Sequence, residues 1–237
     1  MFRFTAPAPR ALAATAVFLV LAATAAAQAA PSGTPAPGRS RRMNANRKAR
    51  IERNIADAYS HRWEVAGGGG FLRFRTGQYL QKISEVSFFG SANYQLSPTL
   101  GIVGDVRGQF GSAKIPNLFS LNGVYSPQIS HYSFMAGPQY RFIAKEKYTV
   151  SANVTGGVTM SKFGGDAKGL RSEQLGMWQD SNYKPTFSVN LIGDYNIYNN
   201  FAVRVQPTYV ATTFGGTVQN NLGVEAGFVY RFGRLSK

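Results

Sequence analysis

The sequence contains no cysteine and only two histidines, His61 and His131. Without cysteine the chain has neither disulfides nor thiolate metal sites. Histidine-based catalysis and metal binding are disfavoured as well, because the two histidines are far apart and no cluster of other metal ligands accompanies them. We therefore expect no metal, no cofactor, and a fold that is held together by backbone pairing and packing alone.

Long apolar runs are missing beyond the N-terminus, so the sequence offers no transmembrane helix. The one run, Ala11 to Ala26, follows two arginines and precedes small residues that permit cleavage after Ala27 or Ala29. This arrangement predicts a secretory signal peptide over residues 1–29 and therefore an exported protein. A retained membrane anchor is the alternative, but about 16 alanine-rich residues are short for a bilayer span.

Acidic residues are scarce: 11 Asp and Glu stand against 26 Lys and Arg, which gives a net charge of +15. Residues 1–53 hold nine of the basic residues and only one acid, Glu52, so half of the excess lies at the N-terminus. A basic arm on an exported chain suits phosphorylated lipid or an anionic cell-wall polymer better than DNA. We expect no nucleic-acid binding.

The composition of residues 30–60 predicts a basic, Pro/Gly-rich periplasmic linker, because residues 30–50 carry almost no large apolar group. From Asn46 to about Tyr59 a short helix is compatible with the spacing of Ile51, Ile55 and Ala58 on one face. Such a helix would lie on the inner leaflet or against the mouth of a barrel. A solvated linker with nascent helicity is the alternative.

Beyond residue 60, apolar and polar residues alternate with a period of two, which indicates strands with unlike surroundings on their two sides. In the last strand, residues 221–233, Phe228 and Tyr230 share the apolar face while Glu225 and Arg231 share the other. Pro138 and Pro207 interrupt two strands, where we expect bulges. Eight strands are predicted, at about residues 62–74, 85–96, 100–110, 132–142, 148–161, 187–197, 201–212 and 221–233.

The strand lengths and connections predict an all-β fold over residues 61–237: an eight-stranded antiparallel up-and-down transmembrane β-barrel. Strands of about 11 residues suit a tilted membrane crossing. Tight turns after strands two, four and six alternate with longer connections, of which residues 111–130 and 163–184 are the longest. Short periplasmic turns and longer extracellular loops are typical of outer-membrane barrels, and an even strand count places both ends in the periplasm.

Aromatic residues decide between a membrane barrel and a soluble lipocalin-like barrel, because the two fold types point their apolar faces in opposite directions. Fifteen aromatics lie on the apolar face and are expected to form two girdles at the lipid interfaces. The small lumen of eight strands has little room for so many rings, which favours the membrane barrel. The girdle residues are Trp63, Phe71, Tyr94, Phe110, Tyr132, Phe134, Tyr140, Phe142, Tyr148, Phe187, Tyr195, Phe201, Tyr209, Tyr230 and Phe232.

The final strand resembles the assembly signal of bacterial outer-membrane proteins, in which a polar residue, a glycine and two aromatics recur at set spacings. Glu225, Gly227, Tyr230 and Phe232 occupy these positions, followed by five more residues where such chains usually stop at the aromatic. Residues 61–233 as a whole resemble eight-stranded outer-membrane barrels of the OmpA, OmpX and opacity-protein type. The resemblance implies recognition by the barrel-assembly machinery and the outer membrane of a Gram-negative-type bacterium. It leads us to expect no C-terminal peptidoglycan-binding domain.

Charged residues on the polar faces of the strands are expected inside the barrel, where unpaired charges would be strongly destabilising. A structural plug of ion pairs and a narrow, gated ion path are the two interpretations, and a filled lumen of eight strands favours the plug. The predicted network comprises Glu64, Glu85, Asp105, Arg107, Arg141, Asp194, Arg204, Glu225 and Arg231.

Three functions remain open at this point. The resemblance favours a structural or surface-interaction role, such as envelope integrity or adhesion, for a protein that is expected to be a monomer. Its partners would be outer-membrane lipid including lipopolysaccharide and a surface ligand of the 111–130 and 163–184 loops. A small porin-like channel is the second candidate. A lipid-A-modifying enzyme is the third, with His131 beside Ser130 and Ser133 as its one catalytic candidate.

Overall fold

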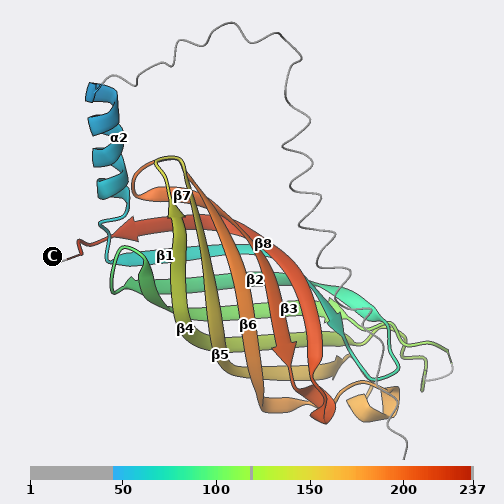
Figure 1. The fold of residues 1–237 in the computed structure, drawn as a ribbon. Helices are drawn as coiled ribbons and strands as arrows, with labels where there is room; N and C mark the ends of the chain where they lie inside the picture. Colours follow the sequence, from blue (N-terminus) through green and yellow to red (C-terminus); the bar gives the residue numbers. More distant parts are fainter. Residues whose placement is uncertain (1–44, 118–119, 236–237) are drawn as a thin grey trace, which may run out of the picture. The chain divides into compact units, whose positions relative to one another are not determined.

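The computed structural model describes residues 45–117 and 120–235, which form one short helix and eight long strands (Figure 1). The elements are α2 (Ala45–Ala58), β1 (Trp63–Arg75), β2 (Lys82–Gln95), β3 (Leu100–Ser112), β4 (Gln128–Ala144), β5 (Tyr148–Gly165), β6 (Ser181–Asn196), β7 (Phe201–Thr212) and β8 (Gln219–Phe232). Two 3-10 turns, η1 (Ser172–Leu175) and η2 (Phe214–Gly216), lie in the loops. None of the described helices is long and apolar enough to cross a membrane. The predicted signal peptide and most of the predicted linker lie outside the described residues.

The eight strands form a single closed antiparallel barrel in chain order. Each strand pairs with the next along the chain, and β1 closes the barrel against β8 from Trp63↔Phe232 to Arg73↔Leu222. Closure leaves no strand edge unpaired, which a lipid environment requires because hydrocarbon cannot hydrogen-bond to backbone groups. The predicted fold class, an eight-stranded up-and-down barrel, is confirmed.

The connections alternate in length as predicted, with all the short turns at one end of the barrel. Residues 96–99, 145–147 and 197–200 form the periplasmic turns, and residues 76–81, 113–127, 166–180 and 213–218 form the extracellular loops. The strands reach further at the extracellular end than the sequence pattern indicates, because β2, β4 and β6 begin earlier than expected. The two long loops are correspondingly shorter than the predicted 111–130 and 163–184.

The bulges expected at Pro138 and Pro207 are absent. Pro138 lies opposite Ile102 on β3, and Pro207 lies opposite Val224 on β8, with no change of register at either position. A proline lacks only one backbone donor, so a strand tolerates it where that donor is not needed by the ladder. The register of β4 against β5 instead shifts at its two ends, between Gln128 and Ile129 and between Arg141 and Ile143.

Outward and inward faces carry opposite chemistry throughout the barrel. Outward residues such as Val86, Phe134 and Phe228 are exposed, while the inward residues are mostly polar and buried. None of the fifteen girdle aromatics is buried. An apolar exterior around a polar interior is the inverse of a soluble barrel and matches a barrel that is surrounded by lipid.

Candidate functional site

The periplasmic half of the lumen is organised around the carboxylate of Glu64, which is buried on β1. Three arginines from different strands converge on it: Arg204 Nη2 at 2.5 Å, Arg231 Nε at 2.9 Å and Arg141 Nη2 at 3.4 Å. Asp194 on β6 balances this positive charge, because it accepts hydrogen bonds from Arg204 and Arg231. Two carboxylates and three guanidiniums thus link five strands across the lumen.

A second group of charges lies around Arg107 on β3, which is completely buried. Its Nε donates to Asp105 at 2.7 Å, its Nη1 lies 3.8 Å from Glu225 Oε2, and its Nη2 donates to Asn190 at 3.0 Å. Glu225 also accepts hydrogen bonds from Ser87 and Gln206. The lumen at this level is filled by satisfied polar side chains.

Glu85 belongs to neither group, although the sequence pattern predicts it to be part of the lumen charge network. Its nearest titratable neighbour is His131, whose Nε2 lies 3.5 Å from Oε1 of Glu85. Both side chains are buried, and these atoms form no hydrogen bond within the described residues. The His131 ring packs edge-on against Phe74, Phe163 and Phe214, with centroids 4.5 to 5.5 Å apart. The pair therefore sits at the boundary between the polar lumen and an apolar layer above it.

The position of His131 corrects the sequence-based catalytic candidate. His131 points into the lumen, whereas Ser130 next to it lies on the outward-facing series of β4, and Ser133 is engaged with Thr159 at 2.8 Å. A lipid-modifying site needs these groups together at the membrane edge. The barrel wall separates His131 from Ser130, because neighbouring residues of a strand point to opposite faces. Ser133 shares the inward face with His131, so both are turned away from the membrane edge.

An apolar cluster of loop and strand-end residues closes the extracellular end of the lumen. Strand ends and all four loops contribute to it, and it surrounds the His131 ring. The sequence pattern did not indicate this layer, because most of its members come from loops without a period and the others from strand ends beyond the predicted strands or on their inward face. The cluster comprises Phe74, Leu80, Ile83, Ala113, Ile115, Val124, Ile129, Phe163, Ala167, Leu175, Met177, Trp178 and Phe214.

Tyr59 closes the periplasmic mouth, a role that its sequence position did not reveal. Its ring lies beneath the guanidiniums of Arg141 and Arg231, with 4.9 and 5.9 Å from ring centroid to Cζ. Its hydroxyl contacts the Lys145 carbonyl at 2.5 Å and Thr149 Oγ1 at 2.7 Å. The residue directly after helix α2 is thereby bound to the lumen network.

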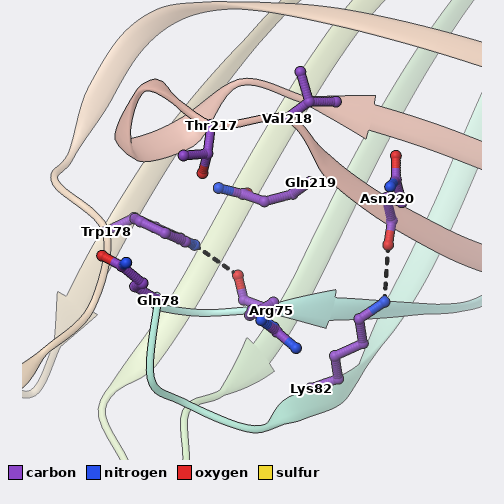
Figure 2. A pocket seen from close by; sticks show the side chains of 8 residues that line it. All are labelled: Arg75, Gln78, Lys82, Trp178, Thr217, Val218, Gln219 and Asn220. Atoms are coloured by element: carbon purple, nitrogen blue, oxygen red, sulfur yellow. Dashed lines mark hydrogen bonds between the residues drawn. The ribbon is translucent and has the colours of Figure 1, made fainter. Parts of the chain in front are cut away.

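A basic cleft opens at the extracellular rim, between the β1–β2 and β7–β8 hairpins (Figure 2). The cleft has a volume of about 270 Å³. Trp178 forms one wall and donates its indole N–H to the Arg75 carbonyl at 2.8 Å. Lys82 donates to the Asn220 carbonyl at 2.9 Å, so its side chain spans from β2 to β8 across the end of β1. Its lining residues are Arg75, Gln78, Lys82, Trp178, Thr217, Val218, Gln219 and Asn220.

The cations of this cleft lie just above the outer aromatic girdle. Arg73 and Arg75 continue the outward-facing series of Phe71, and Arg75 lies opposite Lys82 in the β1–β2 register. All three side chains are exposed, and no acid lies in residues 73–84. Cations at this height face the zone where lipid headgroups meet water.

The predicted assembly-signal residues lie in β8. Some of them are on the lumen face of the strand and others are on its outward face. Glu225 points into the lumen, and Tyr230 and Phe232 stack on the outer wall with ring centroids 6.0 Å apart. Gly227 is tightly enclosed, because a Cβ there would lie 2.2 Å from the carbonyl oxygen of Gly67 on β1. The absence of a side chain at Gly227 therefore lets β8 approach β1 closely where the barrel closes.

A closed eight-stranded barrel with an apolar exterior and an ion-paired interior has the fold of the small outer-membrane barrels. No protein-family model and no curated protein sequence matches the chain. Among solved structures, the chain is similar to Neisserial surface protein A (NspA), with 16% identity, a TM-score of 0.53, and coverage of 72% of this chain and 97% of that one. At this level of sequence identity, the similarity is evidence for a shared fold alone.

Two further solved structures are similar at lower TM-scores. The outer membrane protein OprG from Pseudomonas aeruginosa has 12% identity, a TM-score of 0.49, and coverage of 73% of this chain and 98% of that one. The attachment invasion locus protein Ail of Yersinia pestis, solved with the heparin analogue sucrose octasulfate, has 15% identity, a TM-score of 0.45, and coverage of 71% and 97%. The comparison of folds rests on NspA.

Substitution of Glu64 tests the lumen network. Glu64→Gln leaves Arg141, Arg204 and Arg231 with one carboxylate fewer, so we expect a loss of about 3 kcal/mol in the free energy of unfolding. Glu85→Gln is the matched control, because it makes the same change at a buried site with no arginine partner, and it should alter stability by less than about 1 kcal/mol. Urea unfolding in lipid vesicles, followed by gel mobility, measures both; equal losses would contradict the network's role.

The closure of the lumen at three levels predicts the absence of an open pore. Purified protein in planar bilayers should show no large, steady conductance, because ion pairs, Tyr59 and the apolar cluster fill the path. Reproducible unitary currents at moderate voltage would show instead that the charged lumen conducts.

Proposed function

We propose that this chain is an integral outer-membrane barrel that acts through its extracellular surface, as a surface-interaction protein that binds anionic groups. The observation that carries the proposal is the combination of a filled lumen with a cleft at the rim that is lined by the exposed cations Arg75 and Lys82. Because its lumen is filled, the barrel can interact with other molecules only through its surfaces. The channel and the enzyme are not proposed.

The charge of the extracellular end supports an anionic ligand. This end of the described chain carries eight basic and three acidic residues, whereas the lumen holds four arginines and five acids. Such a one-sided charge raises the local concentration of anions and speeds their association. The basic residues are Arg73, Arg75, Lys82, Lys114, Lys162, Lys168, Arg171 and Lys184, and the acids are Asp166, Glu173 and Asp180.

The cleft lined by Arg75 and Lys82 is the part of this surface whose shape is best suited to binding an anionic group. Trp178 and the β7–β8 hairpin give it walls, and the cations Arg73, Arg75 and Lys82 stand close together on two paired strands. Guanidinium and ammonium groups pair well with phosphate and sulfate oxygens. The ligand class is a phosphate- or sulfate-bearing glycan, either lipopolysaccharide of the same leaflet or a polysaccharide from outside the cell.

Export and assembly belong to the same proposal. The signal peptide directs the chain across the inner membrane, and Glu225, Gly227, Tyr230 and Phe232 present the closing strand to the barrel-assembly machinery. The barrel works as a monomer in the outer membrane of a Gram-negative-type bacterium. Of the two long extracellular loops, the one over residues 166–180 supplies Trp178 to the cleft.

Binding measurements on the full chain in nanodiscs test the proposal. Arg75→Gln combined with Lys82→Gln should weaken binding of lipopolysaccharide or dextran sulfate at least tenfold, since each cation adds about 1 kcal/mol to such contacts. Lys114→Gln combined with Lys168→Gln, the matched control, removes the same charge away from the cleft and should change affinity by less than about threefold.

The two probes separate the ligand sources. Preference for lipopolysaccharide over its dephosphorylated form, with weak dextran sulfate binding, identifies the lipid of the same leaflet as the ligand. Tight dextran sulfate binding identifies an external polysaccharide. If neither polyanion binds, or if both double variants lose affinity equally, the cleft is not the binding site.

A further inference from the structure

A second groove lies at the opposite, periplasmic end, between helix α2 and the turn that joins β2 to β3. It has a volume of about 590 Å³ and a mostly apolar lining. Leu96 continues the outward-facing series of β2 and is 53% exposed, so the groove meets the outer wall of the barrel near the inner aromatic girdle. Its lining residues are Ile55, Ala56, Tyr59, Ser60, Leu96, Ser97, Pro98, Thr99, Ala144 and Leu235.

Three exposed cations are close in sequence to residues that line this groove. Lys145 and Arg234 are sequence neighbours of the lining residues Ala144 and Leu235, and Arg53 precedes Ala56 by nearly one helical turn. At the periplasmic end the described chain carries eight basic residues against three acids. The basic residues are Arg47, Lys48, Arg50, Arg53, Arg62, Lys145, Lys147 and Arg234, and the acids are Glu52, Asp57 and Glu146.

Two of those three acids are already engaged in holding the helix. Asn54 donates to Glu146 at 2.7 Å, and Asn199 donates to Asp57 at 2.7 Å, so α2 is bound to the β4–β5 and β6–β7 turns. The third acid, Glu52, lies 4.0 Å from Lys48 on the same helix. The amide donors do not cancel the charge of Glu146 and Asp57, but eight cations against three acids leave this end of the described chain with a net positive charge.

The groove is also a fixed part of the barrel mouth. Tyr59, which forms its inner wall, is held beneath Arg141, and Arg141 donates to the Pro98 carbonyl in the groove at 2.8 Å. The backbone N–H of Leu235 donates to the Ser60 carbonyl at 2.7 Å. An occupant would meet a surface that is already formed, which reduces the entropy lost on binding.

We propose that this groove binds one anionic phospholipid of the inner leaflet. Its apolar lining takes the glycerol and upper acyl region, because it lies at the height where the barrel wall enters the bilayer. Arg53, Lys145 and Arg234 surround the phosphate. Cations at a membrane surface each strengthen the binding of anionic lipid about fivefold, which selects anionic over zwitterionic headgroups. The basic helix α2 is thereby assigned the role of a lipid-binding collar.

Native mass spectrometry of the full chain, extracted from membranes and titrated with defined lipid, tests this site. Phosphatidylglycerol should be retained at concentrations at least tenfold lower than phosphatidylcholine with the same acyl chains. The triple change Arg53→Gln, Lys145→Gln and Arg234→Gln should remove most of that preference. Lys114→Gln, Lys168→Gln and Lys184→Gln, at the extracellular end, remove the same charge and should leave it intact.

A substitution that fills the groove tests the apolar part separately. Ala56→Trp places a large ring in the groove and should lower phosphatidylglycerol retention at least fivefold, whereas Ala49→Trp, exposed on the same helix outside the groove, should not. Heat-modifiable gel mobility verifies that each variant is folded.

Three results would overturn the site. Equal retention of the two lipids removes the charge selection, and retention that survives Ala56→Trp places the lipid elsewhere on the surface. Displacement of phosphatidylglycerol by soluble peptidoglycan fragments would assign the basic helix to the cell wall. None of these outcomes depends on the extracellular cleft.

Discussion

The carboxylate of Glu64 and its three arginines are the constraint on which the rest of the structure depends. The exterior of the barrel faces hydrocarbon, so charged groups on the strands at the depth of the membrane core must be accommodated inside. There the charges are stable only in pairs, and a guanidinium that lost its carboxylate would be strongly destabilising. Arg141 on β4, with Arg204 and Arg231 on the neighbouring strands β7 and β8, meets the acid on β1 across the lumen. Their pairing therefore joins the two halves of the barrel and fills its centre.

The two ends of the barrel follow from this filled centre. The apolar cluster around His131 covers the network on the extracellular side, and Tyr59 covers it on the periplasmic side. Only the extracellular and periplasmic rims remain available for interactions. Both rims carry more basic than acidic residues, whereas the lumen does not. A membrane whose two surfaces carry phosphate groups complements such a charge distribution. The extracellular cleft and the periplasmic groove are the places where this complementarity has a shaped surface.

Much of this architecture could be predicted from the sequence, because a period of two determines which face each residue occupies. The inward position of Glu64 and the outward position of Phe134 both follow from parity alone. Parity does not determine which residues meet across the lumen, since that depends on the register and tilt of the strands. Glu85 for this reason lies beside His131 rather than an arginine, and the bulge expected at Pro138 is absent. A helix ending near Tyr59 could be predicted, but its spacing could not show which groups Tyr59 contacts in the lumen. Most of the apolar cluster comes from loops without a period, so the pattern did not indicate it.

The central claim is that the apolar face of every strand lies in lipid while the charges are sealed inside. The absence of cysteine allows single cysteines to be introduced and labelled with a nitroxide spin label. Labels at outward positions such as Val86, Phe134 and Val205 should collide freely with oxygen, which concentrates in hydrocarbon, and hardly at all with a water-soluble nickel complex. A label on an extracellular loop residue such as Tyr125 should show the reverse. If the outward labels collided mainly with the nickel complex, the apolar faces would not lie in lipid and the account would be wrong.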